Sequence, residues 1–490
     1  MKGALKVLLI LVMTSISGQA KVYNSRTFTL KNGLQVVVIE NHRAPVVTQM
    51  VWYKVGSGDD PIGKSGVAHF LEHMMFKGPK NSASAKITRE VEALGGSLNA
   101  ATSYDYTYYY QTVAARYLED VMRLESERMK QLTILENEAQ NELQVILEER
   151  RMRTDNQPFG RFIEFFHSQY FRTYPKRLPP IGWAHEIKAL TAADARDFHR
   201  KWYSPSNAIL FLAGDITFKK AKRLAEKYYG SLKRRPIPKR ARLTEPPQPQ
   251  AKVRLDLEMP DVRVPYFIKA FPAPTIFDKD ISALYTSDVL TNLLAAVPTG
   301  FLYRDLVENK KVSTFITVYY PYQTLGPSYL LIACQPTPGI SMKELEKSLE
   351  ESLISFRTTY LNDTALKKAK TRLLATLIYD QDSVLSGREI PEGLALGLSL
   401  KQMEQWDDKI SEVTLDQVKA LFDFIILKKY HVTGTIVPLA PLKQQNQTVS
   451  TFDSTERGSS LVKEATKGEA SDHQSVVTQT KSLPLQPEKK

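Results

Sequence analysis

The chain is constrained most by the five residues from His69 to His73, which read His-Phe-Leu-Glu-His. In a helix, His69 and His73 are one turn apart on the same face, so their imidazoles can bind one Zn²⁺ ion. Glu72 then lies beside the ion, where its carboxylate can accept a proton from water. The flanking residues are apolar, and Ser65-Gly66 offers a helix start, so we expect this helix to be buried. Lone helix histidines are usually structural, but a buried histidine needs a partner, and a metal ion is one.

A catalytic zinc site also needs a third protein ligand, which has to come from a distant segment that folds over this helix. Residues 136–152 predict a glutamate-rich helix in which Glu142 and Glu149 are two turns apart and share a face. The alternative is a solvated helix held by Glu–Arg pairs such as Glu149 and Arg153. Spacing alone does not choose between Glu148 and Glu149 as the ligand.

These segments resemble the pitrilysin/insulinase family of zinc peptidases (inverzincins), and within it the bacterial branch that is similar to mitochondrial processing peptidase. The resemblance covers about residues 24–440. It implies that Glu149 is the third zinc ligand and that Glu142 supports the site. Three motifs carry it: residues 68–74, residues 95–100 and residues 148–152.

The resemblance also implies how a substrate binds. Asn99, Ala100 and Ala101 match a segment that lies near the substrate strand in the family. We expect a peptide to add there as an extended strand at a sheet edge, which makes few demands on its sequence and favours unfolded peptides. Glu72 would accept a proton from the attacking water and pass it to the leaving amine. These features predict a zinc metalloendopeptidase.

One departure from the family lies in the second half of the chain. Active single-chain members carry an arginine and a tyrosine that hold the substrate backbone, and the matching positions here are Val307 and Thr314. We therefore expect a homologous partner subunit that supplies this pair, or a homodimer. The alternative is a non-catalytic family member that binds peptides or stabilises an assembly. Because all four metal-site residues are present, we favour the enzyme.

The order of apolar segments predicts two similar halves. A helix, a turn with a tyrosine and an apolar strand occur in residues 190–213 and again in residues 413–437. We therefore expect an α+β fold of two homologous domains, each a mostly antiparallel sheet packed with helices, that face each other across a cleft. In the first half we expect a hairpin at residues 28–38, strands at 46–55, 106–113 and 207–212, and helices at 87–94 and 117–129.

The termini and the charge distribution divide the chain further. Two early lysines, a short apolar run and Gly18-Gln19-Ala20 predict a secretory signal, so we expect export, most simply to the periplasm, or a membrane anchor if the signal is retained. Cys334 is the single cysteine, which excludes an internal disulfide. We expect a signal peptide at 1–20, a zinc-binding domain at 21–230, a basic proline-rich linker at 231–251, a second domain without a metal site at 252–440, and a disordered tail at 441–490.

The net charge of +13 does not indicate a nucleic-acid partner. Residues 231–254 contain eight lysines or arginines and one acid, so more than half of the excess charge lies in this segment. We interpret this segment as a solvated, extended connector. No phosphate-binding loop stands out, and neither does an array of basic and aromatic residues that would suggest RNA or DNA binding.

Overall fold

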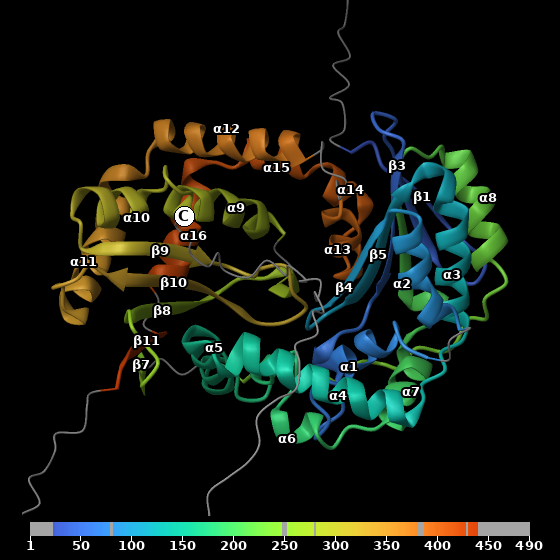
Figure 1. Ribbon diagram of the computed structural model, residues 1–490. Coiled ribbons are helices and arrows are strands. Elements are labelled where there is room, and N and C mark those ends of the chain that lie inside the picture. The colour runs from blue at the N-terminus through green and yellow to red at the C-terminus, as the bar shows by residue number, and fades with distance from the viewer. Residues whose placement is uncertain are drawn as a thin grey trace, which may run out of the picture.

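The computed structural model describes residues 23–78, 82–246, 252–278, 281–380, 387–427 and 430–439. The predicted signal peptide and the predicted tail lie outside the described residues. Within those ranges the chain folds into two sheets, each packed with helices (Figure 1). The first half of the chain is the blue-to-green part of the ribbon, and the second half is the yellow-to-red part. The predicted α+β fold of two domains is confirmed.

The first sheet has six strands in the order β1-β2-β6-β3-β5-β4. β2 and β6 run parallel, and the other neighbouring pairs run antiparallel. The predicted hairpin forms between β1 and β2, across a turn in which Gly33 has a φ of 89° that suits glycine. The strands are β1 (Arg26–Thr29), β2 (Gln35–Glu40), β3 (Val46–Tyr53), β4 (Ser97–Thr102), β5 (Thr107–Ala114) and β6 (Ala208–Gly214).

The second sheet repeats this order strand for strand, beginning from the position of β2. Its five strands are arranged β7-β11-β8-β10-β9. β7 and β11 run parallel, as β2 and β6 do, and the remaining pairs run antiparallel. The two halves are therefore built alike, as the recurring sequence pattern predicted. The strands are β7 (Lys252–Met259), β8 (Tyr266–Ala273), β9 (Ser313–Tyr319), β10 (Ser328–Pro336) and β11 (His431–Pro438).

Helices cover both sheets. The first half contains α1 (Val67–Met74), α2 (Ala83–Ala93), α3 (Leu118–Lys130), α4 (Glu136–Arg150), α5 (Pro158–Tyr170), α6 (Ala184–Ile187), α7 (Ala192–Trp202) and α8 (Phe218–Tyr229). The second half contains α9 (Ser282–Ala295), α10 (Phe301–Tyr303), α11 (Met342–Ser355), α12 (Asp363–Asp380), α13 (Glu389–Ala395), α14 (Leu400–Glu404), α15 (Trp406–Glu412) and α16 (Leu415–Ile426). The helices predicted at residues 87–94 and 117–129 correspond to α2 and α3. α1, α3 and α8 pack on one face of the first sheet.

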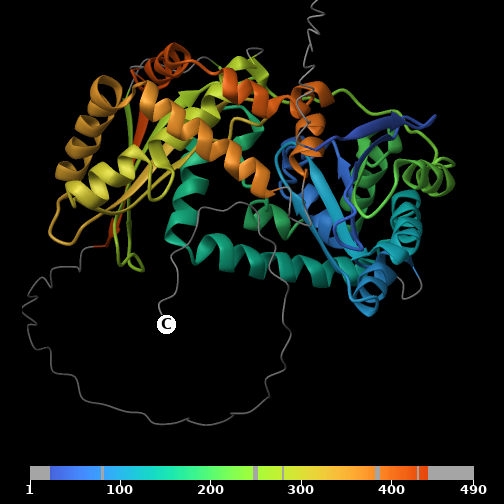
Figure 2. The ribbon, with the colours of Figure 1, turned by 90° about the horizontal axis from the view of Figure 1, so that it is seen from above.

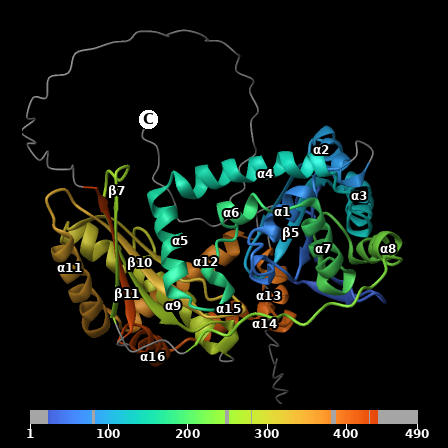
Figure 3. The same ribbon diagram turned by 90° about the horizontal axis from the view of Figure 1, so that it is seen from below.

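Each half of the chain contributes a helix that packs on the sheet of the other half. α5 of the first half packs on β7 and β11 of the second sheet (Figures 1 and 3). Phe162 and Phe166 of α5 are fully buried there. Gly434 in β11 leaves room for the ring of Phe162, because a Cβ atom there would lie 2.4 Å from the ring. In return, α13 of the second half packs on β3 and β6, over Trp52 and Phe211. Each sheet is thus covered in part by the other half of the chain.

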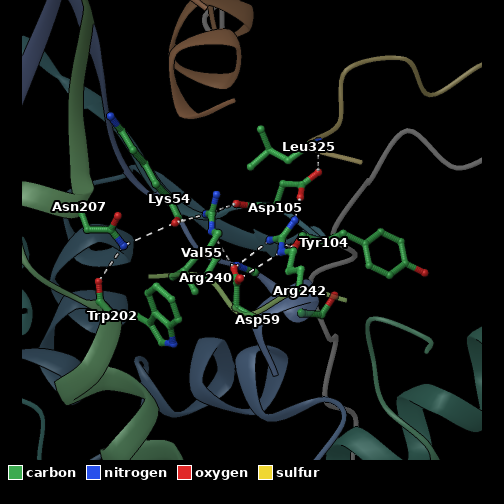
Figure 4. Close-up of polar contacts among 12 residues, drawn as sticks. Lys54, Val55, Asp59, Tyr104, Asp105, Trp202, Asn207, Arg240, Arg242 and Leu325 are labelled. Carbon is green, nitrogen blue, oxygen red and sulfur yellow. Dashed lines mark hydrogen bonds and ion pairs between the residues drawn. The ribbon is translucent and has the colours of Figure 1, made fainter. Parts of the chain in front are cut away.

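The predicted linker also ties the halves together (Figure 4). Arg242 donates to both carboxylate oxygens of Asp59, at 2.9 and 3.0 Å, and pairs with Asp105. The other oxygen of Asp105 accepts from the Thr324 hydroxyl at 2.8 Å and from the Leu325 N–H at 3.1 Å, both in the second half. The side chains of Arg242, Asp59 and Asp105 are only 9%, 1% and 3% exposed. This network is a buried junction.

The interpretation of the linker as a solvated connector is therefore wrong at Arg240 and Arg242. Besides Arg242, Arg240 pairs with Asp59 at 3.3 Å and donates to the carbonyl of Lys54. The physical reason is that two buried carboxylates need cations close by, and the linker supplies them. Other basic residues of the segment, such as Lys239, are exposed as expected.

We expect Arg242→Ala to lower the free energy of unfolding by about 3–5 kcal/mol, because it leaves two buried carboxylates without their main cation. Chemical denaturation measures the change. Lys239→Ala is the matched control from the same segment, and we expect it to stay within about 0.5 kcal/mol of the unsubstituted protein. Equal stabilities of the two variants would mean that the buried pairs make no net contribution.

Candidate metal centre

The helix that carries both histidines is held at its first turn by residues from outside it. α1 begins after Gly66, which has a φ of 87° and provides no side-chain cap. Instead, the carboxylate of Asp60 accepts from the N–H groups of Gly66 and Ala68, at 2.7 and 3.0 Å. The N–H of Ser65 donates to Glu186 at 2.6 Å. These bonds satisfy donors that a helix N-terminus leaves open, and so they fix α1 in place.

Three side chains from two helices converge at this point. The Nε2 atom of His73 lies 3.3 Å from Oε2 of Glu149, and the Nε2 atom of His69 lies 3.7 Å from the same oxygen. One potential ligand atom from each residue lies within 4.8 Å of the others. A tetrahedral zinc ion with bonds of about 2.0–2.2 Å holds its ligand atoms about 3.3–3.6 Å apart. The spacing of the three groups therefore fits such an ion.

The structure distinguishes Glu149 from its neighbour. Glu149 points toward the histidines and also pairs with Arg153 through its other oxygen, at 2.8 Å. Glu148 has a side chain that is 55% exposed and pairs with Arg151. Glu149 therefore faces the histidines and also forms the expected pair with Arg153, but its side chain is only 14% exposed and not solvated.

The histidine His69 has the properties of a metal ligand. Burial, together with the neighbouring His73, lowers the pKa of His69 to about 3, so its ring is neutral at neutral pH. A neutral imidazole is the form that binds metals. Its buried Nδ1 atom has no hydrogen-bond partner among the described residues. The other ring nitrogen, Nε2, lies 3.7 Å from Glu149 and is the atom that would bind an ion.

Glu142 orients the second histidine. Its Oε1 atom lies 2.9 Å from Nδ1 of His73, and its Oε2 atom lies 2.8 Å from the Lys77 ammonium. An Nδ1–H that donates to Glu142 leaves Nε2 of His73 available for a metal. Burial alone would lower the pKa of His73, but its bonds to Glu142 and Glu149 raise it to about 9. Burial alone would raise the pKa of Glu149, but His73 and His69 lower it to about 2.

Glu72 lies beside the three-residue cluster without belonging to it. Its side chain is buried, and Oε2 accepts a hydrogen bond from the hydroxyl of Thr102 at 2.5 Å. Burial is the main cause that raises the pKa of Glu72 to about 7. A carboxylate with a pKa near neutral can both accept and return a proton.

The predicted substrate segment forms the edge of the first sheet. Asn99, Ala100 and Ala101 lie in β4, which has β5 as its single neighbour among the described strands. Strand β4 ends at Thr102, the residue that binds Glu72. The edge strand of the described sheet therefore ends beside the candidate site.

The two positions at which the sequence departs from the family, Val307 and Thr314, both lie in the second half of the chain. Val307 lies in a π-helical segment, Arg304–Asn309, and packs partly buried against the core. Thr314 is exposed on β9, which occupies the same edge position in the second sheet as β4 does in the first.

Sequence reasoning did not identify several residues that shape the site. Asp60, Lys77 and Thr102 bind the backbone or side chains around the candidate ligands. Their separations from the histidines along the chain are not set by helix geometry, so the sequence alone does not place them at the site. Only Lys77 carried a signal, since it lies one helical turn after His73 and could reach the same partner.

Comparison with known families identifies both halves. Residues 35–182 match the description "Insulinase (Peptidase family M16)", and residues 189–373 match "Peptidase M16 inactive domain". The first match includes all three candidate metal ligands.

Individual relatives agree. Zinc protease PqqE of Helicobacter pylori is 32% identical over 386 residues, which cover 78% of this chain and 85% of the relative. The uncharacterized zinc protease YmxG of Bacillus subtilis is 23% identical over 407 residues, which cover 83% of this chain and 96% of the relative.

Solved structures share the fold. A crystal structure of a protease from Helicobacter pylori has a TM-score of 0.78 and 27% identity, and covers 84% of this chain and 99% of its own. The periplasmic protease PqqL of Escherichia coli has a TM-score of 0.70 at 20% identity, over 91% of this chain but 53% of its own. The chain therefore belongs to peptidase family M16, the insulinase family, whose cofactor is zinc.

Proposed function

We propose that this protein is an exported zinc metalloendopeptidase that hydrolyses peptide bonds in unfolded peptides or small polypeptides. The observation that carries the proposal is the convergence of His69, His73 and Glu149, with Glu72 beside them. Membership of family M16 and relatives named zinc proteases support it.

The roles of the residues follow from their positions. His69, His73 and Glu149 would hold Zn²⁺, which would supply a Lewis acid for the peptide carbonyl and for the attacking water. Glu72 takes the proton from that water and returns it to the leaving amine. Thr102 holds the Glu72 carboxylate at the end of β4. In this scheme the metal ligands and the base have separate tasks.

The substrate binds as an added strand along β4. As an edge strand among the described residues, β4 can pair through its main chain with an extended peptide, independent of the sequence of that peptide. A strand in that position runs toward Thr102 and Glu72. Strand addition needs an extended segment whose main-chain groups are unpaired, and an unfolded peptide supplies such a segment along its length, so unfolded peptides are the proposed substrates.

Export and a partner complete the proposal. The predicted signal at residues 1–20 favours export, and the similar fold of PqqL belongs to a periplasmic protease. Among the described residues, none of the helices has the length and apolar character needed to cross a bilayer. This chain covers 53% of PqqL, and Val307 and Thr314 replace the expected arginine and tyrosine. We infer that a homologous subunit, or a second copy, supplies the other half.

We expect Glu72→Gln to retain zinc but to lose peptide cleavage, because the amide keeps the shape of the side chain but cannot accept the proton. Metal analysis and cleavage of an unfolded peptide measure the two effects. A chelator should abolish cleavage by the unsubstituted protein, and added zinc should restore it. Cleavage by Glu72→Gln would contradict the role of Glu72, whereas zinc binding without any cleavage would favour a non-catalytic subunit.

We expect Glu149→Gln to weaken zinc binding by at least about tenfold, because a neutral amide replaces the anionic ligand. Glu148→Gln is the matched control, since it makes the same change one residue earlier on an exposed side chain. We expect it to bind zinc as the unsubstituted protein does. Competition with a chromophoric chelator measures both affinities, and equal affinities would remove Glu149 from the ligand set.

We expect the protein to purify from its native host as a dimer, either with a homologous subunit or with a second copy. Mass determination and metal analysis of the complex test the partner and the zinc together. Full peptidase activity of the isolated monomer would contradict the need for a partner.

A further inference from the structure

The residue that follows the third ligand has an unusual environment. Glu149 is the penultimate residue of α4, and the next side chain, Arg150, is only 6% exposed. Its two terminal nitrogens donate to both oxygens of Glu164 in α5, at 2.6 and 2.8 Å. One of them also donates to the carbonyl of Gly182 at 2.9 Å, and the other lies 3.3 Å from Asp155. Arg150 thus joins three segments at the end of α4.

The Gly182 carbonyl belongs to a segment that lies directly on the start of α1. A Cβ atom at Gly182 would lie 2.4 Å from the carbonyl oxygen of Ser65, and one at Gly66 would lie 2.4 Å from that of Ile181. Both glycines have positive φ, of 94° and 87°. The N–H of Trp183 donates to the Ser65 hydroxyl at 2.9 Å. The two backbones are therefore in contact, with no side chain between them.

We propose that Arg150 is a positioning residue of the metal centre. Through Gly182, it holds the end of α4 that carries Glu149 against the start of the helix that carries both histidines. The inference rests on the zinc site proposed for those three ligands. Consecutive residues of α4 therefore have different tasks, since Glu149 faces the ion and Arg150 sets the distance between the two ligand-bearing helices.

The guanidinium group of Arg150 can make contacts that a lysine ammonium cannot. A planar guanidinium can pair with both oxygens of Glu164 and reach the Gly182 carbonyl at once, whereas the single ammonium of lysine cannot span these acceptors. Arg150→Lys therefore keeps the charge and the ion pair but loses the link to the segment above α1. A purely structural arginine would affect stability but would not alter the zinc affinity of the folded protein.

The test is the zinc affinity of the folded full-length chain, measured by competition with a chromophoric chelator. We expect Arg150→Lys to raise the zinc dissociation constant by about 10–100-fold, the range found when outer partners of metal ligands are removed. Circular dichroism of the metal-free protein verifies folding. Arg151→Lys is the matched control, because Arg151 is the next residue, is 63% exposed and pairs with exposed Glu148. We expect it to leave the affinity unchanged.

A second variant approaches the same contact from the other side. Gly182→Ala leaves Arg150 intact but pushes the segment away from Ser65, so it should also weaken zinc binding, and it decides the question if Arg150→Lys does not fold. A folded variant with the affinity of the unsubstituted protein would overturn the inference. If the unsubstituted protein binds no zinc, the proposed function fails together with this inference. Zinc binding without peptide cleavage contradicts only the proposed activity.

Discussion

The structure depends on one constraint, which is that neither sheet is covered on both faces by described helices of its own half. The second sheet packs against Phe162 and Phe166 of α5, and the first packs against α13. Burying one phenylalanine side chain contributes about 1.5–3 kcal/mol, so these contacts favour one joined body over two separate domains. The Arg242 junction adds a polar connection between the halves, next to the apolar ones.

This constraint extends to the candidate site. α4 begins in the first half and ends at Arg150, one residue after the candidate ligand Glu149. A π-helical turn, Arg151–Asp155, and then α5 carry the chain onto the second sheet (Figure 2). A π-helical turn places more residues in one turn than an α-helix does, and such turns are frequent at functional sites. Glu149 is therefore located where the arm between the two halves bends, and its position depends on both halves.

The sequence predicted the elements that local periodicity controls. The hairpin, the helices around His69 and Glu149, and the repeated helix and strand near the ends of both halves all follow from residue spacing. The linker did not follow from spacing, because the partners of Arg242 lie 137 and 183 residues earlier in the chain and only the fold brings them together. The exchange of α5 and α13 was also not predictable, since an amphipathic helix does not specify which sheet it covers.

The sequence also could not decide between Glu148 and Glu149, because tertiary packing sets which of them faces the histidines. Both residues belong to one helix, and a rotation of one position exchanges them. The packing of α4 against α1 sets that rotation, and it involves Asp60, Glu186 and Arg150, which lie outside the histidine motif.

The contact between Gly66 and Gly182 has a consequence for how such chains diverge. Any side chain at either position meets a main-chain oxygen, and replacing neighbouring side chains cannot move that atom. Substitution of Gly66 or Gly182 is therefore restricted by the main-chain contact, whether or not the candidate metal ligands are kept. A pair of glycines at this separation could serve as a fingerprint for chains that seat their histidine helix in the same way, including copies whose ligands have been lost.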